Sequence, residues 1–72
     1  MEPGHLRIRG TDVRRQIVRQ GLKQWWVAEA TGVNRTTLQR WISGRISKVR
    51  RVHAERLAAV LDSPRSEFAT ER

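Results

Sequence analysis

Hydrophobic positions near the start of the chain recur at the spacing of a helix. Val13 and Ile17 lie four residues apart, so they share one helical face. Thr11 is a favourable N-cap residue, and Gly21 is the residue type that most often ends a helix in the left-handed conformation. This pattern predicts a helix over residues 12–20.

Two shorter helices joined by a tight turn are predicted next. The first begins near Lys23 or Gln24 and ends at Gly32, after which Asn34 is a strong N-cap residue for the second. The second helix covers residues 35–43, and Gly44 ends it. Its apolar face is formed by Leu38, Trp41 and Ile42. A short glycine-containing turn between two helices is the arrangement of a helix-turn-helix motif.

The C-terminal part of the chain continues with a helical pattern. Residues 51–61 form a further predicted helix, and its inward positions are Leu57, Ala58, Val60 and Leu61. Ser63 and Pro64 are expected as the N-cap and the first residue of a last short helix, after which Phe68 folds back onto the core.

The first ten residues follow a different period. Between His5 and Arg9, apolar and polar residues alternate, as they do in a strand. We favour a disordered basic arm over residues 1–10; the alternative is a short strand that pairs with residues 46–49 or with a second subunit. The predicted fold class is all-α, a compact domain of four to five helices over residues 11–70 that follows this arm or strand.

Length and composition restrict the class of protein further. Seventy-two residues provide for one small domain, and 38% hydrophobic residues with three tryptophans are enough for a core. The absence of cysteine excludes disulfides and thiolate chemistry. Because the sequence has neither a membrane-length apolar run nor the apolar core of a signal peptide, we expect a cytoplasmic protein without a membrane partner.

The charge balance indicates a polyanionic partner. Fifteen Lys and Arg against seven Asp and Glu give a net charge of +8 and a pI near 11.8, which makes nucleic acid the first candidate. Four basic residues are concentrated between residues 45 and 52: Arg45, Lys48, Arg50 and Arg51. We expect this segment to hold backbone phosphates, with one side chain in a narrowed minor groove as a further option; the alternative is a flexible basic loop.

No arrangement of residues indicates catalysis. His5 and His53 are far apart in sequence, without cysteine or a carboxylate at ligand spacing, so no metal site is expected. The sequence also lacks a P-loop, a Ser-His-Asp order and paired acids. We therefore expect a protein that is not an enzyme and has no cofactor, metal or small-molecule ligand.

Residues 21–44, GLKQWWVAEATGVNRTTLQRWISG, resemble the lambda-repressor/Cro-type helix-turn-helix family, also known as the xenobiotic-response-element type. The shared pattern is a Gln that opens one helix, an apolar-Ala pair, a Gly turn, a polar N-cap, and a recognition helix that ends in Gly. Residues 54–64, AERLAAVLDSP, look like the fourth helix of that family and the start of its fifth. The resemblance covers about residues 12–68.

The sequence departs from the family pattern in two places. Many members pair an Arg on the first helix with a Glu near the end of the third, whereas this chain has Ile17 and Ile42 at those positions. An apolar contact is expected there instead, since a buried ion pair often adds no net stability over apolar packing. The segment between Gly44 and Leu57 is also about two residues longer than the family pattern, so single basic residues are not matched across it.

The resemblance and the chemistry of the side chains together define a candidate DNA interface. Helix 35–43 is expected to enter the major groove, where Arg suits guanine O6 and N7, and Thr suits polar atoms or the thymine methyl. Gln24 is expected on a phosphate, with Asn34 and Thr37 as capping or phosphate-contacting residues, whereas Arg35, Thr36, Gln39 and Arg40 are expected to read bases. The complete predicted set is Gln24, Asn34, Arg35, Thr36, Thr37, Gln39, Arg40, Arg45, Lys48 and Arg50.

The three tryptophans are expected in different environments. Trp41 matches a buried family position and is expected in the core, and Trp26 is expected to shield the edge of the core. Trp25 follows Gln24 directly, so its indole N–H is placed to donate to a phosphate; simple packing at the edge is the equal alternative.

The function implied is sequence-specific binding of double-stranded DNA by a transcriptional regulator of bacterial or phage type, most simply a repressor. A homodimer on a two-fold site is expected, with the segment Leu6 to Arg9 and the region of Phe68 as candidates for the contact. Alternatives are a DNA-architectural or recruiting subunit, such as an excisionase or a small packaging subunit, and an antitoxin-like interaction module. A general cationic binder of RNA or anionic lipid fits the sequence least.

Overall fold

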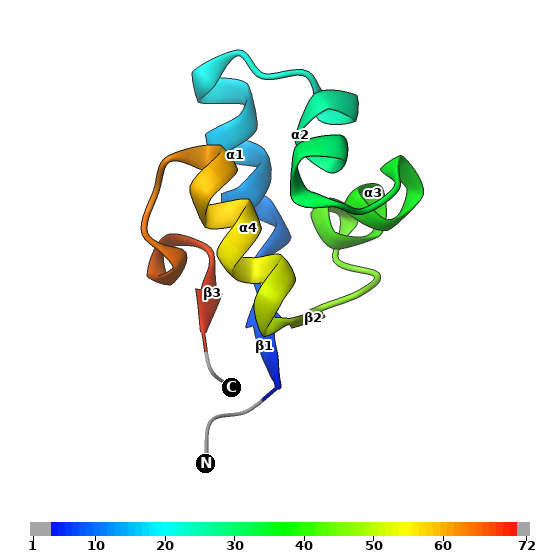
Figure 1. The fold of residues 1–72 in the computed structure, drawn as a ribbon, viewed down its shortest axis with the longest axis vertical. Helices are drawn as coiled ribbons and strands as arrows, with labels where there is room; N and C mark the ends of the chain where they lie inside the picture. Colours follow the sequence, from blue (N-terminus) through cyan, green and yellow to red (C-terminus); the bar gives the residue numbers. More distant parts are fainter. Residues whose placement is uncertain (1–3, 71–72) are drawn as a thin grey trace.

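The structure, a computed structural model, describes residues 4–70. Between these limits the chain forms four α-helices, one three-residue 3₁₀ helix and a three-stranded sheet (Figure 1). In chain order these are β1 (His5–Ile8), α1 (Gly10–Gln20), α2 (Gln24–Thr31), α3 (Arg35–Ser43), β2 (Lys48–Arg50), α4 (Arg51–Leu61), η1 (Arg65–Glu67) and β3 (Ala69–Thr70). The predicted helix-turn-helix pair is therefore present as α2 and α3.

The helices α1, α2 and α3 end at the three glycines that the sequence predicted as their ends. Gly21, Gly32 and Gly44 follow α1, α2 and α3 in the left-handed conformation, with φ of 68°, 87° and 83°. This conformation carries little steric cost only for glycine, so the sequence determines these three ends locally.

The start of α1 differs from the prediction. The helix begins at Gly10 with Arg9 in the N-cap position, so Thr11 is not the cap. The Arg9 Nε donates to the Asp12 Oδ2 at 2.7 Å and covers the first turn. A Cβ atom at residue 10 would lie 2.2 Å from the carbonyl oxygen of Trp41, so glycine allows α1 to start directly against α3.

The N-terminal segment is a strand, and the disordered arm that we favoured is wrong. The sheet order is β2-β1-β3, and both pairs are antiparallel. Leu6 lies opposite Val49, and Ile8 lies opposite Ala69. Because β1 is the central strand, its main chain is hydrogen-bonded within the chain on both sides. The strand β3 was not predicted at all.

The core lies between the sheet and the helices. Leu6, Ile8, Val49 and Ala69 turn inward from the strands. Phe68 is fully buried, as predicted, although the last short helix is only the 3₁₀ turn η1, which Pro64 precedes. The helices contribute the remaining buried hydrophobic residues, Val13, Ile17, Val27, Ala28, Leu38, Trp41, Ala54, Leu57 and Leu61, and Ile42 packs against them in part.

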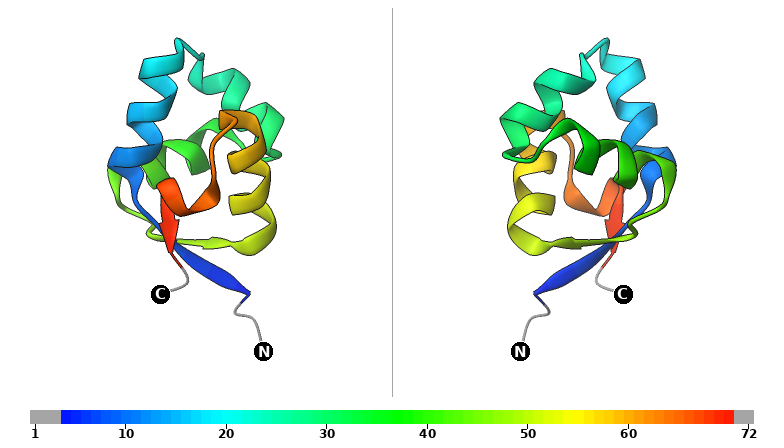
Figure 2. Two further views of the ribbon diagram at one scale, coloured as in Figure 1. Left: turned by 90° about the vertical axis from the view of Figure 1, so that its left-hand side faces the viewer. Right: turned by 90° about the vertical axis from the view of Figure 1, so that its right-hand side faces the viewer.

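The helix-turn-helix pair and the segment from η1 to β3 lie on opposite sides of the molecule, and the sheet lies at one end of it. In Figure 1, α2 and α3 lie to the right, η1 and β3 lie to the left, and the sheet lies below the helices. The right-hand view of Figure 2 shows α3 in front, with α2 above it and β2 below it. The helix-turn-helix pair is thus displayed on one side of the long axis of the molecule.

Candidate nucleic-acid interface

The first turn of α3 is held by its own N-cap. The Asn34 Oδ1 accepts a hydrogen bond from the Thr37 backbone N–H at 2.7 Å, which satisfies a donor that the helix itself leaves open. Asn34 therefore caps α3, one of the two roles expected for it. On the inner side, Leu38 and Trp41 are buried and fix how the helix packs.

The opposite side of α3 is open to solvent. The four predicted base-reading side chains, Arg35, Thr36, Gln39 and Arg40, are all exposed, and Thr37 is half-buried. Within residues 4–70, neither Arg35 nor Arg40 forms an ion pair with a carboxylate. Both guanidinium groups are therefore available to a ligand.

A hydrogen bond joins the two helices of the motif. The Gln39 Nε2 donates to the Gln24 Oε1, which connects the middle of α3 to the first residue of α2. The sequence indicated both residues but not this contact, because it depends on how the helices cross. With its oxygen occupied, Gln24 keeps its N–H groups for an acceptor, at a helix N-terminus that favours anions.

The basic segment after α3 divides into two groups. Arg45 lies exposed in the connection between α3 and β2. Lys48 and Arg50 are exposed on β2, on either side of the buried Val49, so they point to the outer face of the sheet. The flexible basic loop considered from the sequence is therefore wrong for residues 48–50, since they form a strand.

Trp41 and His53 connect α3 to α4. Their ring centroids are 5.9 Å apart with the planes tilted by 46°, and Trp41 belongs to the core as predicted. Burial lowers the pKa of His53, and the positive charges of Arg50 and Arg56 lower it further. The neutral form of the ring is therefore favoured over the charged form at this position.

The two adjacent tryptophans are largely exposed. Trp25 is 54% exposed and Trp26 is 43% exposed, while Val27 and Ala28, the next two residues of α2, are buried. Trp26 thus covers the edge of the core only in part. Trp25 is exposed to solvent beside Gln24.

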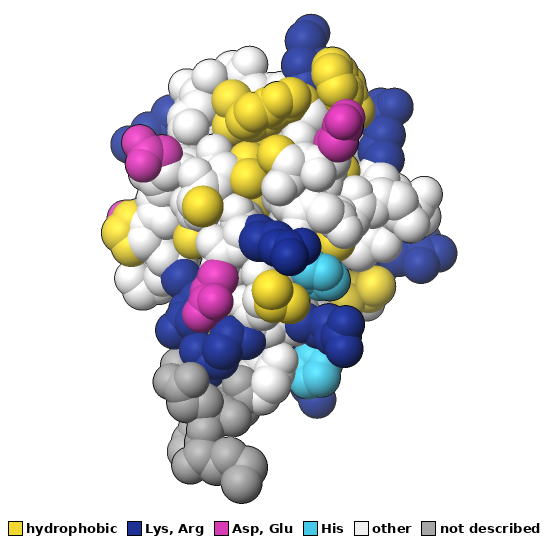
Figure 3. Space-filling model, in the orientation of Figure 1, with side chains coloured by type: hydrophobic (Ala, Val, Ile, Leu, Met, Phe, Trp, Pro, Cys, Tyr) yellow, Lys and Arg dark blue, Asp and Glu magenta, His cyan; other side chains and the backbone are white. Residues whose placement is uncertain are grey.

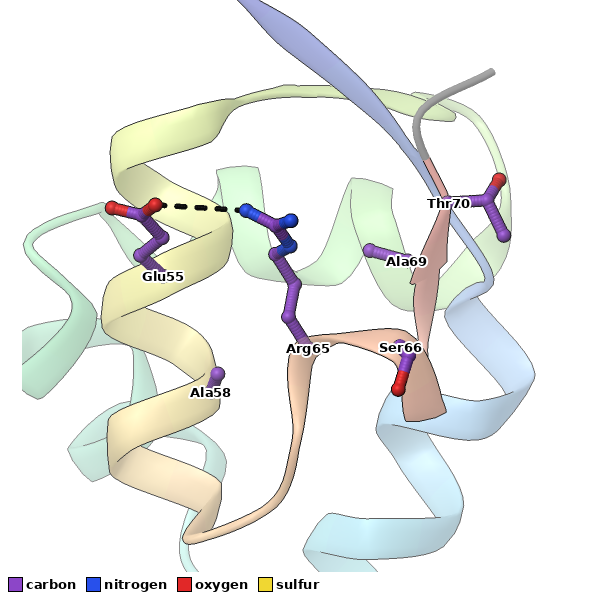
Figure 4. A pocket seen from close by; sticks show the side chains of 6 residues that line it. All are labelled: Glu55, Ala58, Arg65, Ser66, Ala69 and Thr70. Atoms are coloured by element: carbon purple, nitrogen blue, oxygen red, sulfur yellow. Dashed lines mark ion pairs between the residues drawn. The ribbon is translucent and has the colours of Figure 1, made fainter. Parts of the chain in front are cut away.

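Other features of the described chain lie away from α3. A surface hollow of about 560 Å³ is bordered by α4, η1 and β3, and the Arg65–Glu55 ion pair of 3.5 Å bridges it (Figure 4). None of the predicted DNA-binding residues lines it. Within residues 4–70, no three His, Asp or Glu side chains gather as metal ligands, and no helix has the length and apolar character to cross a membrane.

Comparisons with known proteins identify the family of this fold. A family model described as a helix-turn-helix domain matches residues 5–70. The solved structure of the restriction-modification controller protein C.AhdI from Aeromonas hydrophila is similar, with 28% sequence identity and a TM-score of 0.74, over 81% of this chain and 86% of that one. The search of curated proteins gave no match. The chain thus belongs to the helix-turn-helix domain family and is a DNA-binding transcriptional regulator.

Proposed function

We propose that this protein reads a specific duplex sequence by placing α3 in the major groove, and that it represses transcription by occluding promoter DNA in the cytoplasm of a bacterium. The observation that carries the proposal is the exposed side of α3, where polar and cationic side chains stand on a capped, well-packed helix. It acts by binding, without catalysis or a cofactor. The similarity to a restriction-modification controller protein supports the regulatory role.

The side chains of α3 provide the direct readout. Arg35 and Arg40 each offer the two donors that fit O6 and N7 of guanine. Gln39 offers a donor and an acceptor for adenine, and its bond to Gln24 restrains the amide that reads the base. Thr36 suits the thymine methyl or a polar base edge.

Contacts with phosphates position α3 in the groove. Gln24, at the start of α2, has side-chain N–H groups that the bond from Gln39 does not use, and Trp25 beside it offers an indole N–H. Arg45, Lys48 and Arg50 supply charge on the other side of α3, and Thr37 is close enough to the helix tip to assist. These contacts raise affinity for any sequence and make it depend on salt.

A homodimer is part of the proposal, because one short helix reads only a few base pairs. Two copies on a two-fold site separate genuine sites from the large excess of competing DNA. Both edges of β1 are used inside the chain, and Phe68 is buried. The contact between subunits is therefore expected from surface side chains rather than from these two sequence candidates.

Selection from a random duplex pool at about 0.15 M salt, near physiological ionic strength, tests the proposal. We expect a two-fold motif with half-sites about one helical turn apart. Arg35→Ala or Arg40→Ala then relaxes preference at one or two base positions and costs about 1–3 kcal/mol of binding free energy on the selected site.

The matched control is Lys48→Ala, which removes the same charge outside α3. It is expected to weaken the selected and the random duplex alike, because it contacts no base. Equal losses on both duplexes for all three variants, or a pool without any enriched motif, would contradict direct readout.

A further inference from the structure

The outer face of the sheet carries a basic cluster that the recognition helix does not explain. The burial along β1 alternates, with Leu6 and Ile8 inside and His5 and Arg7 outside. The strand register places Arg7 opposite Lys48 and His5 opposite Arg50. Residues directly opposite each other share one face of a sheet, so these four side chains form a single array, which we call the basic sheet face.

The close spacing of positive charges in this array destabilises the folded protein. Opposite residues are about 5 Å apart between Cβ atoms, and residues two apart on a strand are about 7 Å apart. Like charges directly opposite each other destabilise a sheet. No strand residue between positions 4 and 70 is acidic, and among these residues Arg7, Lys48 and Arg50 form no ion pair.

The basic sheet face adjoins the proposed DNA-reading surface. Residues 44–47 connect α3 directly to β2, and β2 lies below α3 in Figures 1 and 2. Arg50 is near enough to His53 to affect its titration, and the His53 ring lies 5.9 Å from the Trp41 ring of α3. In Figure 3, Lys, Arg and His side chains gather over this lower part of the visible surface.

We propose that the basic sheet face binds the phosphate backbone of the same duplex, beyond the groove that α3 reads, with Arg7 as a backbone contact supplied by β1. This inference rests on the proposed function and extends its footprint. Duplex DNA carries one charge per about 1.7 Å of its axis, so it meets several closely spaced cations at once, which a single carboxylate or phosphate does not. A second copy of the chain would bring the same positive charges and be repelled.

The test compares Arg7→Gln with Arg14→Gln in the full chain. Arg14 is exposed on α1, so its replacement removes one charge without touching the sheet. Binding is measured between about 50 and 200 mM salt on the selected site and on a random duplex. We expect Arg7→Gln to flatten the plot of log affinity against log salt by about 0.9 on both duplexes, while Arg14→Gln leaves the slope of the natural chain.

A second variant separates a DNA contact from a structural role. Arg7→Glu places an acid opposite Lys48, so the melting temperature of the free protein is expected to rise at low salt while affinity for both duplexes falls. A structural role would move both quantities in the same direction.

The experiment distinguishes a failure of the sheet contact from a failure of sequence readout by α3. If Arg7→Gln has the same salt slope as Arg14→Gln, the basic sheet face does not bind DNA, even where α3 still selects a motif. If the pool yields no motif but Arg7→Gln alone flattens the slope, the proposed sequence readout fails and the sheet contact stands.

Discussion

At the scale of single residues, the end of α2 contains a polar group without a partner. Thr31 is fully buried, and its Oγ1 has no hydrogen-bond partner among the described residues. A buried hydroxyl that has lost its water without gaining a protein partner costs free energy of folding. Thr31 lies at helical spacing from the buried Val27 and Ala28, which accounts for its inward position, but spacing alone does not show whether an acceptor is in reach.

Thr31→Val is therefore expected to stabilise the protein. Valine has nearly the same shape and a similar helix propensity, so the change removes mainly the unpaired hydroxyl. We expect the free energy of unfolding to rise by about 1 kcal/mol, measured by urea denaturation. Thr11→Val, at an exposed position of α1, is the control and should give no such gain. A loss of stability in Thr31→Val would mean that its hydroxyl is satisfied in solution.

At the scale of elements, α3 combines stability and binding in its first turn. The Asn34 cap holds the Thr37 N–H, so Asn34→Ala is expected to lower the free energy of unfolding by about 1 kcal/mol. Asn34→Asp keeps an accepting oxygen and places a negative charge at the positive end of the helix, so stability should be retained. If α3 enters the groove as proposed, the same negative charge is repelled by the DNA phosphates, so binding should weaken.

Measuring urea denaturation and DNA affinity for both variants separates these effects. The alanine variant tests the cap, and the aspartate variant tests proximity to the DNA backbone. Undiminished DNA affinity in Asn34→Asp would place the tip of α3 away from the duplex. Unchanged stability in Asn34→Ala would mean that the first turn does not depend on its cap.

The elements also show which structural features are encoded locally. The ends of the three N-terminal helices follow from Gly21, Gly32 and Gly44, each of which stops its helix through its own backbone conformation. The strands are different, since β3 has only two residues and takes its shape from pairing with β1 about sixty residues earlier. The alternation in His5–Ile8 was visible in the sequence, but without its partners it fitted an arm as well as a strand.

The candidate interface also has some features that follow from local sequence and others that depend on contacts between distant segments. Helical periodicity was enough to place Arg35 and Arg40 on an open side of α3. The bond from Gln39 to Gln24 depends on how distant segments cross, so sequence spacing did not reveal it. Pairing of the first strand with residues 46–49 was only the alternative to an arm, and the register that sets Arg7 opposite Lys48 comes from the structure. Arg7 was therefore not among the predicted site residues, although its alternation with Leu6 and Ile8 marked it as outward-facing.

At the scale of the whole molecule, the core and the basic surface meet at His53. Its ring packs on Trp41 of the core, and Arg50 and Arg56 act on it from outside. Burial, and then these two charges, lower the pKa of His53 below its ordinary value of 6.5. The folded protein therefore takes up a proton at this site less readily than the unfolded chain does.

This linkage predicts that stability falls as the solution is acidified. Above pH 6.5 the ring is mainly neutral in both states, so the contribution of His53 to stability is fully present. As the pH falls below 6.5, the unfolded chain binds the proton first, and this binding lowers the free energy of the unfolded state relative to the folded one. The loss continues until the pH has passed below the lowered pKa of the folded state.

Melting temperatures measured at intervals from about pH 7.5 to about pH 5 check this dependence, since linkage relates their change to proton uptake. His53→Gln removes the titrating ring, so the decline should become shallower, although the lost ring contact with Trp41 lowers stability at every pH. His5→Gln, on the exposed face of β1, keeps His53 in place and should retain the decline of the natural chain. An equally steep decline in His53→Gln would show that His53 is not the source of the acid sensitivity.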